Sequence, residues 1–254
     1  MFLQDDPFLD EAGNARVLRG VTVISGATRL AELAGRIGFE TVWIEVEHGP
    51  ASFSEIEALC FAAEAGGAYP TVRIPDSQRH HVLRALEVGA RIVVVPMVND
   101  AETARQIVRH GKFPPLGSRG YNTRSRGVNY GLEDPTTSFA RANARTHLFA
   151  QIETMEAVRN LEEICAVEGL AGVFIGPGDL SVSMGCTGAL TNPELIDIVV
   201  HCVKHARKQG KHCGILVAPG PLLDAALKAG CDLIFAGGDI ADLSKAWRSL
   251  LASL

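Results

Sequence analysis

The chain has 254 residues, of which 47% are hydrophobic and 21% charged, with a formal net charge of -5 at pH 7. These values indicate a soluble globular protein with a sizeable core, and the charge gives no reason to expect nucleic acid or an anionic membrane as a partner. No secretory signal is visible, no apolar stretch reaches transmembrane length, and the six cysteines are scattered without a C-x-x-C pair. We therefore expect a cytoplasmic protein with reduced thiols and no membrane partner.

Short β-branched runs alternate with segments of helical period along the whole chain. The runs predict eight strands, at 17–24, 41–47, 69–75, 91–98, 147–153, 171–176, 212–217 and 232–237. Because the runs are continuous in valine, isoleucine and leucine, both faces of each strand should be covered, as in a parallel sheet. Eight such units predict an α/β fold with a single domain over 1–254, a (β/α)8 TIM barrel. A doubly wound open sheet is the alternative.

One connection, residues 112–146, is much longer than the others. It follows the fourth predicted strand and carries Arg119, Arg124 and Arg126 among glycine, asparagine and tyrosine residues. Connections longer than about 15 residues without clear structure are usually functional or disordered. We predict a flexible active-site loop that gathers anions at the mouth of the barrel, with a solvated surface loop as the alternative. Further on, an apolar helical pattern at about 241–253 predicts a C-terminal helix.

Polar side chains stand at the carboxyl ends of several predicted strands, which in a barrel meet at one mouth. They are Glu45, Glu47, His48, Arg73, Gln151, Glu153 and Asp179. Glu153 and Asp179 would repel each other unless a cation lay between them, and two carboxylates suit an octahedral divalent ion. His48 offers a base that titrates near neutrality, and Arg73 a fixed cation for a carboxylate or enolate oxygen. The ordinary alternative is that Glu153 caps a helix and Asp179 begins a turn.

Longer segments resemble a known family. EVEHGP, TVRIP, LRALEVGARIVVVPMVNDAETA, SRGYNTRSRGVNYG, QIET and GPGDLS occur in the order and spacing of the HpcH/HpaI-type aldolases. These are class II (metal-dependent) pyruvate aldolases that include 2-dehydro-3-deoxyglucarate aldolase. The resemblance covers nearly the whole chain from about residue 17, and its most specific part is QIET followed by the aspartate of GPGDLS.

The resemblance implies a role for each matching residue. Glu153 and Asp179 match the metal ligands of this family, for Mg²⁺ or Mn²⁺, with Co²⁺ and Zn²⁺ as further candidates. His48 matches the catalytic histidine, and Arg73 matches the arginine that stabilises the enolate. Gln151 matches a substrate-contacting glutamine.

Other positions depart from the family pattern. Gly178 stands where relatives often have serine or alanine, so only its backbone N–H is available to a substrate carboxylate. Glu45 and Glu87 stand where the family usually has aspartates that support the histidine, the second often across a subunit interface. Both changes keep the charge and add one methylene. Arg119, Arg124 and Arg126 are candidates for holding a polar or anionic acceptor.

The resemblance implies an enzyme, a carbon–carbon lyase that forms a metal-bound enolate of a pyruvate-type 2-oxo acid and adds it reversibly to an aldehyde. It also implies a homo-oligomer, a hexamer built as a trimer of dimers. Three alternatives stay open here. The same enolate chemistry can serve thioester condensation or 2-oxo acid decarboxylation. A phosphosugar isomerase is suggested by the glycine turn at 236–239, and a catalytically silent binding protein by the two glutamates.

Overall fold

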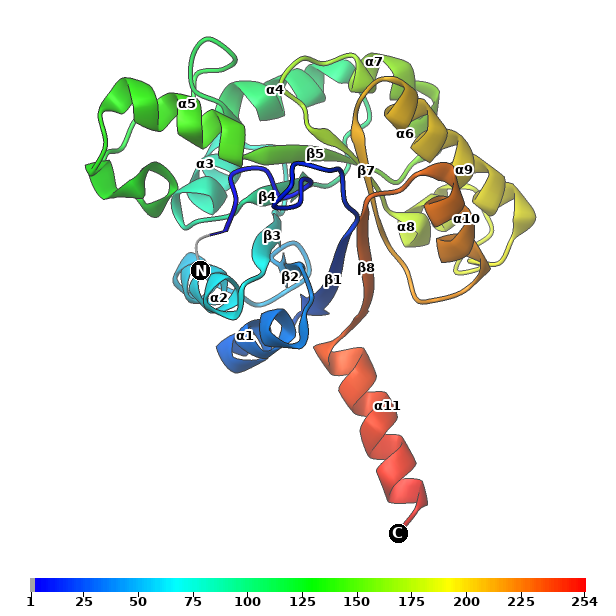
Figure 1. Ribbon diagram of the computed structural model, residues 1–254. Coiled ribbons are helices and arrows are strands. Elements are labelled where there is room, and N and C mark those ends of the chain that lie inside the picture. Colours follow the sequence, from blue (N-terminus) through cyan, green and yellow to red (C-terminus); the bar gives the residue numbers. More distant parts are fainter. Residues whose placement is uncertain (1–2) are drawn as a thin grey trace.

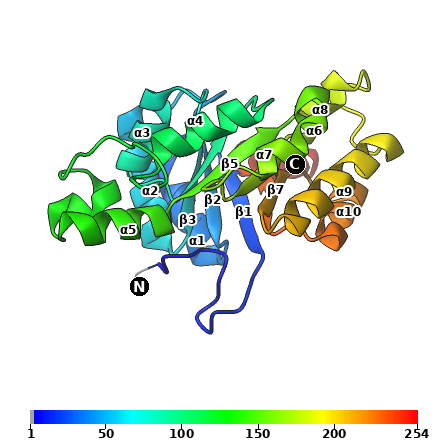
Figure 2. The ribbon, with the colours of Figure 1, turned by 90° about the horizontal axis from the view of Figure 1, so that it is seen from above.

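The structure is a computed structural model, and it describes residues 3–254. Eight parallel strands form a closed barrel in the order of the sequence, and helices surround it (Figures 1 and 2). The strands are β1 (Leu18–Val23), β2 (Thr41–Glu45), β3 (Tyr69–Arg73), β4 (Ile92–Val95), β5 (His147–Ile152), β6 (Gly172–Ile175), β7 (His212–Leu216) and β8 (Leu233–Gly238). Pairing of β8 with β1 closes the sheet, with Leu18 opposite Leu233. The predicted (β/α)8 TIM barrel is confirmed, and the open-sheet alternative is wrong.

The helices follow the strands as the apolar periodicity predicts. They are α1 (Thr28–Ile37), α2 (Phe53–Gly66), α3 (Arg79–Glu87), α4 (Ala101–Gly111), the 3₁₀ helix η1 (Arg126–Gly131), α5 (Pro135–Arg145), α6 (Met155–Arg159), α7 (Leu161–Cys165), α8 (Pro177–Ser183), α9 (Pro193–Lys208), α10 (Pro221–Ala229) and α11 (Asp239–Ala252). Local sequence fixes several ends. Before α2, for example, the Ser52 side chain accepts from the Glu55 N–H and the Glu55 side chain accepts from the Ser52 N–H.

Aromatic side chains fill the inside of the barrel. The ring centroid of Trp43 lies 4.9 Å from that of Phe174 and 5.0 Å from that of Phe235. Glycines on neighbouring strands make room for these rings: a Cβ on Gly214 would lie 2.3 Å from Phe174, and one on Gly20 would lie 2.4 Å from Phe235. The interior is therefore a packed core, as barrels of this size require, and ligands must bind at an end.

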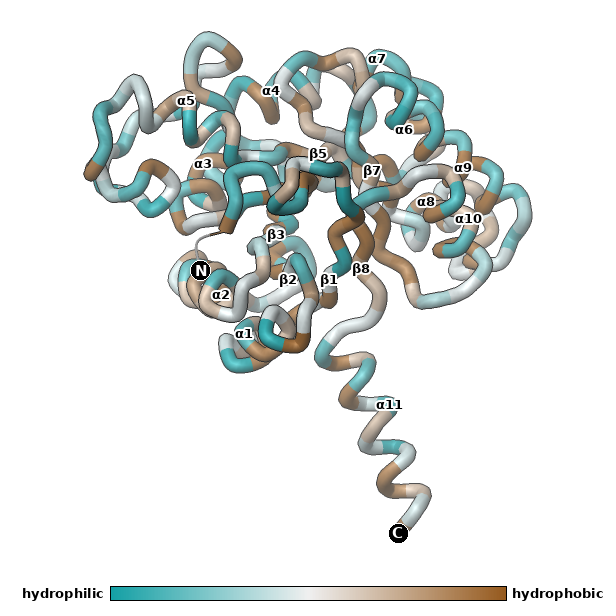
Figure 3. The backbone as a smooth tube through the Cα atoms, viewed as in Figure 1, coloured by the Kyte–Doolittle hydropathy of each residue, from teal (hydrophilic) through white to brown (hydrophobic). Residues whose placement is uncertain are grey.

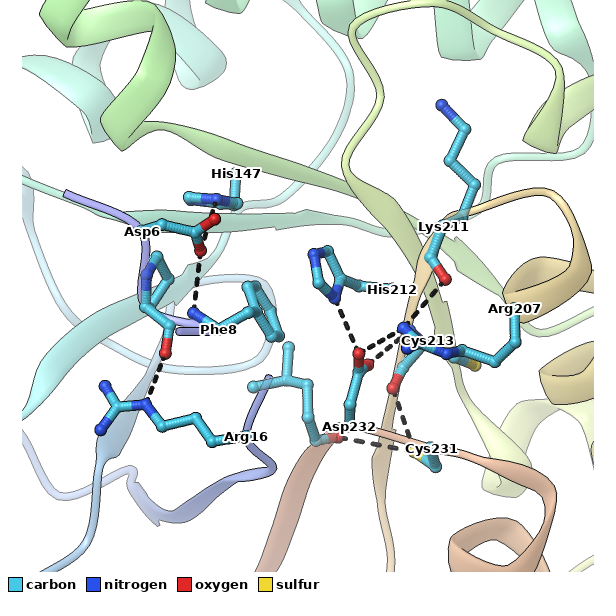
Figure 4. A network of polar contacts seen from close by, with 12 residues as sticks. Asp6, Phe8, Arg16, His147, Arg207, Lys211, His212, Cys213, Cys231 and Asp232 are labelled. Atoms are coloured by element: carbon cyan, nitrogen blue, oxygen red, sulfur yellow. Dashed lines mark hydrogen bonds and ion pairs between the residues drawn. The ribbon is translucent and has the colours of Figure 1, made fainter. Parts of the chain in front are cut away.

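The N-terminal segment closes the amino-terminal end of the barrel. Phe8 is buried there and stacks on His212 with ring centroids 3.7 Å apart. His147, at the start of β5, faces Asp6 across 3.6 Å, and Figure 4 shows this contact together with the partly buried contact of His212 Nδ1 with Asp232 at 2.7 Å. Burial lowers the pKa of His147 to about 3, so this ring is neutral at pH 7. The carboxyl ends of the strands are left to form the accessible mouth.

The segment 112–146 differs from its prediction in both structure and place. It contains η1 and α5, and Phe113, Val128 and Ala142 form a small hydrophobic core of its own. Its two ends are tied together by Lys112, whose ammonium donates to the carbonyls of Asn143 and Thr146. Because the segment connects a helix, α4, to the start of a strand, β5, it lies at the amino-terminal end of the barrel. It is therefore neither an unstructured loop nor a lid over the mouth of its own barrel.

A C-terminal helix forms as α11, but it does not cover the barrel. It projects away from β8 in Figure 1, and no residue of it is buried. Its exposed apolar side chains are Ile240, Leu243, Trp247, Leu250 and Leu251. Figure 3 shows that hydrophobic and hydrophilic colours alternate along α11. Within one chain, this apolar surface has no partner among residues 3–254.

Among residues 3–254, no helix combines the length and the apolar composition that crossing a bilayer requires.

Candidate active site

Side chains from β2, β3, β5 and α8, or from the residues directly after them, lie at the carboxyl end of the barrel. Glu45 and Arg73 are the last residues of β2 and β3, which pair in register at that point. Gln151 lies one residue from the end of β5, Glu153 follows that strand, and Asp179 lies in the first turn of α8. His48 follows β2 at the same end. The structure thus brings most of the predicted site residues together.

Arg73 is held by a buried carboxylate. Its Nε donates to Glu45 Oε2 at 2.9 Å and its Nη2 lies 2.7 Å from the same oxygen, which also accepts from Trp43 Nε1 at 2.9 Å. Burial raises the pKa of Glu45, but hydrogen bonding and attraction to Arg73 outweigh it and leave that pKa below its ordinary value. The pair is therefore ionised at neutral pH, and it fixes the guanidinium at the mouth.

The other oxygen of Glu45 positions the main chain that carries His48. Oε1 accepts from the backbone N–H groups of Glu47 at 2.8 Å and His48 at 3.0 Å. The carboxylate that approaches the imidazole is instead that of Glu47, whose Oε2 lies 3.7 Å from His48 Nε2 and 3.1 Å from Arg73 Nη1. Direct support of the imidazole by Glu45, as expected from the family pattern, is not met in this chain, because four donors already saturate that carboxylate.

Glu153 is nearly inaccessible and lies close to other negative charges. Its exposed fraction is 3%. Its Oε1 accepts from the Met97 N–H at 2.6 Å, and its Oε2 accepts from Gln151 Nε2. Burial raises the pKa of Glu153, and the charges of Asp179 and Glu47 raise it further. A cation beside Glu153 would relieve both the burial and the repulsion.

The oxygen atoms at this place fit a hard divalent ion. Glu47 Oε2 and Gln151 Oε1 are buried and make no hydrogen bond with any residue in 3–254. Burial, followed by mutual repulsion with Glu45 and Asp179, also raises the pKa of Glu47 in spite of Arg73. Within those residues, no three His, Cys, Asp or Glu side chains form a ready-made cage. An ion on Glu153 and Asp179 would therefore complete its shell with water and substrate oxygens, as Mg²⁺ commonly does.

Two glycines, Gly176 and Gly178, leave space in the site that a side chain would fill. A Cβ on Gly176 would lie 2.9 Å from Glu153 Oε2 and 3.1 Å from Gln151 Nε2, so the end of β6 can approach these groups only without a side chain. Gly178 has the opposite surroundings, since a Cβ there would meet nothing within 4 Å. The departure from serine or alanine at Gly178 therefore leaves open space beside Asp179.

The remaining predicted residues lie elsewhere in this chain. Glu87 ends α3 and lines a shallow groove with Phe53, Glu57 and Arg84, on the outside of the barrel. Arg119 and Arg126 line a cavity at the amino-terminal end. Arg124 is exposed on the same segment. Any role of these four at an active site requires the mouth of a neighbouring copy.

Sequence reasoning assigned no role to three groups of this site. Glu47 could have been suspected from the sequence, because it lies between Glu45 and His48, which were both assigned a role, in Glu-Val-Glu-His. The Trp43 N–H and the Met97 N–H had none, because they reach Glu45 and Glu153 only through the folded geometry. Met97 adopts a φ of 54°, which is unusual for a residue with a side chain and directs its N–H at Glu153.

The glycine pair at the end of β8 does not favour an isomerase-type phosphate site. The Gly238 N–H donates to Asp242 Oδ2 at 2.9 Å, and the Asp239 carboxylate accepts from the N–H groups of Ile24 and Ser25 at 3.0 Å. A Cβ on Gly237 would lie 2.6 Å from Asp242. The chain's own carboxylates thus occupy the backbone donors that a phosphate would need.

Comparison with known proteins agrees with this geometry. The family model described as HpcH/HpaI aldolase/citrate lyase matches residues 21–246. The hydroxypyruvate/pyruvate aldolase of Roseobacter denitrificans is 34% identical over 226 residues, covering 87% of this chain and 86% of that protein. The 2-keto-3-deoxy-L-rhamnonate aldolase of Salmonella gallinarum is 31% identical over 251 residues, covering 98% and 93%.

A solved structure gives the same result. The crystal structure of the HpcH/HpaI aldolase from Desulfitobacterium hafniense DCB-2 matches with a TM-score of 0.88 and 28% identity, covering 94% of this chain and 92% of that one. The chain therefore belongs to the HpcH/HpaI aldolase/citrate lyase family, and it is a carbon–carbon lyase of the class II aldolase type.

Proposed function

We propose that the chain catalyses the reversible aldol addition of a pyruvate-type 2-oxo acid to a small aldehyde, at the mouth formed by β2, β3, β5 and α8. The observation that carries this proposal is the buried Glu153 carboxylate, whose pKa the charge of the exposed Asp179 raises further, together with the fixed Arg73 guanidinium. The names of the relatives support the substrate class, since both are aldolases of keto acids.

Class II chemistry calls for a divalent metal ion, and Glu153 and Asp179 would hold it. We infer Mg²⁺ or Mn²⁺ from the all-oxygen donor set, with Co²⁺ or Zn²⁺ as the other candidates. When bound, such an ion supplies a Lewis acid that makes protons next to a keto group removable. Gln151 keeps Glu153 oriented by donating to its Oε2 and leaves its own Oε1 free for water or substrate.

The chain's own side chains handle charge and protons. Arg73 would hold the oxygen on which negative charge develops, because Glu45 and Glu47 fix its guanidinium before substrate arrives. His48 would move the proton, since its side chain is 69% exposed and Glu47 Oε2 lies 3.7 Å from its Nε2. The Gly178 N–H would meet the substrate carboxylate. Exclusion of water from the bound substrate then requires a cover over the mouth.

A neighbouring copy can supply that cover, so we also propose that the protein acts as a homo-oligomer, a hexamer as in the family. The support is α11, whose exposed apolar side chains include Trp247 and Leu251 at 63% and 74%. Glu87 and the exposed Arg124 would reach a mouth only across such an interface, whereas Arg119 and Arg126 line the cavity at the other end of the barrel. A cytoplasmic location is in keeping with six free cysteines, five of them buried.

A condensation assay tests the proposed function. Pyruvate and hydroxypyruvate are incubated with a panel of short hydroxyaldehydes and Mg²⁺ or Mn²⁺, and the products are identified by mass spectrometry. We expect new carbon–carbon products with the native protein and none with Glu153→Gln. Glu156→Gln is the matched control, since Glu156 is three residues further on and exposed. Products of equal yield from Glu153→Gln, or from a chelated enzyme, would overturn the proposal.

A further inference from the structure

A large cavity lies at the end of the barrel opposite the mouth. Its volume is about 770 Å³, and α2, α3, α5, η1 and the start of β4 enclose it. The charged side chains that line it are Glu64, Arg91, Arg119, Arg126, Arg141 and Arg145. Five of these six charges are positive, which is unusual for a chain with a net charge of -5.

Some of the arginines have carboxylate partners and some have none. Arg126 pairs with Glu64, and Arg145 Nε lies 3.1 Å from Asp5 Oδ1. Arg91 donates to the backbone carbonyls of Gln4 and Asp5 instead, at 2.7 and 2.8 Å. The guanidinium of Arg119 lies over the ring of Phe113 at 4.8 Å and is attracted by the charge of Glu87, but its buried Nε has no hydrogen-bond acceptor in residues 3–254. Carboxylates therefore compensate the positive charges of Arg91 and Arg119 only in part, from a distance and without a direct ion pair.

These two side chains are also deeply buried and incompletely hydrogen-bonded. Each has an exposed fraction of 5%. Arg91 Nη1 and Arg119 Nε are buried and find no acceptor in residues 3–254, and the same holds for Arg126 Nη1. Burial lowers the pKa of Arg91 and of Arg119 to about 10, so both stay protonated at pH 7. A buried charge with unpaired donors is costly unless an anion compensates it.

We propose that this cavity binds a compact organic anion that carries at least two carboxylate or phosphate groups. Guanidinium groups match both acids in planar, two-point geometry. The space is larger than one inorganic anion needs, and Phe61, Leu86 and Tyr130 supply apolar wall for a carbon skeleton. The site lies at the far end of the barrel from Glu153, and it uses no metal ligand.

Calorimetric titration of chelator-treated protein with citrate and with inorganic pyrophosphate tests the site without metal at the mouth. Sodium chloride of matched ionic strength serves as the blank. We expect one anion per chain, and the acid that binds more tightly, citrate or pyrophosphate, identifies the acid group. Arg119→Gln should weaken binding roughly 10- to 100-fold, since one charge-assisted contact is lost. Arg105→Gln, at an exposed arginine on α4, should bind as the native protein does.

Two further variants keep the result interpretable. Arg119→Lys keeps the charge but loses the planar fork, so it should bind with intermediate affinity if Arg119→Gln does not fold. Glu153→Gln should leave the affinity unchanged. No binding of either anion, equal binding by folded Arg119→Gln, or loss of binding in Glu153→Gln would overturn the proposal. Because the titration contains no metal and measures no turnover, its failure would leave the aldolase proposal untouched.

Discussion

At the scale of single residues, Glu45 shows how one extra methylene is accommodated. Its two oxygens accept from the N–H groups of Glu47, His48, Trp43 and Arg73. The side chain therefore links the main chain after β2 to the guanidinium on β3 through hydrogen bonds. It is a positioning residue, since it reaches the imidazole of His48 only through the main chain.

Replacement of Glu45 should lower turnover more than substrate binding. An amide offers one acceptor oxygen where the carboxylate offers two, so Glu45→Gln must release either the His48 main chain or Arg73. Glu45→Asp is shorter and cannot span both sets of donors. We expect kcat to fall roughly a hundredfold in each variant, as for a displacement of about 1 Å at a reacting group. Unchanged kcat and an unchanged pH profile in both folded variants, by steady-state kinetics, would make Glu45 a bystander.

The buried Glu153 carboxylate should destabilise the folded protein when no metal is bound. Its pKa is raised by burial above the ordinary 4.5, so the folded state keeps this proton to higher pH than the unfolded chain does. The contribution of Glu153 to the free energy of unfolding is therefore most favourable below pH 4.5, and it is lost as the pH rises through the pKa of Glu153 in the folded state. At pH 7 and without metal, Glu153→Gln should therefore melt a few degrees higher than the native protein.

Added Mg²⁺ should reverse that order. Binding to the folded state alone raises the melting temperature of the native protein, whereas Glu153→Gln has lost a ligand and should respond weakly. Differential scanning fluorimetry at several pH values measures both effects, with Glu156→Gln as control. A native protein that melts above Glu153→Gln in chelator at pH 7 would contradict the assignment of an uncompensated buried carboxylate.

At the scale of elements, the strands and helices could be predicted because their periodicity is local. The position of segment 112–146 could also have been derived, since any helix-to-strand connection lies at the amino-terminal end of such a barrel. Its internal structure could not, because Lys112 and Asn143 meet only after the segment has folded back on itself. The pattern of α11 was compatible with packing on its own barrel or on a neighbour, and sequence alone did not separate the two.

The exposed side of α11 gives a direct test of assembly. Trp247 is 63% exposed on the described chain, and its burial in an interface would remove a large apolar surface from water. Trp247→Glu should therefore shift the protein toward smaller species in light scattering coupled to size exclusion. Lys245→Glu, on the same helix, is the control that changes charge without removing an apolar contact. A native protein that is monomeric at micromolar concentration would contradict the proposed assembly.

At the scale of the whole molecule, the alternation of strands and helices in the sequence determines both the fold and the grouping of the site residues. Alternating units dictate a closed barrel, and a closed barrel brings strand ends such as Glu45, Arg73 and Gln151 together. The long-range geometry is what sequence could not supply: the inward N–H of Met97, the approach of Glu47 to His48, and the place of Glu87 on the outer surface. The two ends of the barrel thus carry opposite charges, carboxylates at the mouth and arginines in the cavity below.

The central claim is that Glu153 and Asp179 support metal-dependent removal of a proton from a pyruvate-type acid. Exchange of the pyruvate methyl protons with deuterium, followed by NMR without any aldehyde, isolates that step from acceptor choice. We predict exchange by the native protein with Mg²⁺ or Mn²⁺, loss of exchange with chelator, and loss in Glu153→Gln and Asp179→Asn. Exchange that continues at the native rate in chelator or in either folded variant would contradict the account.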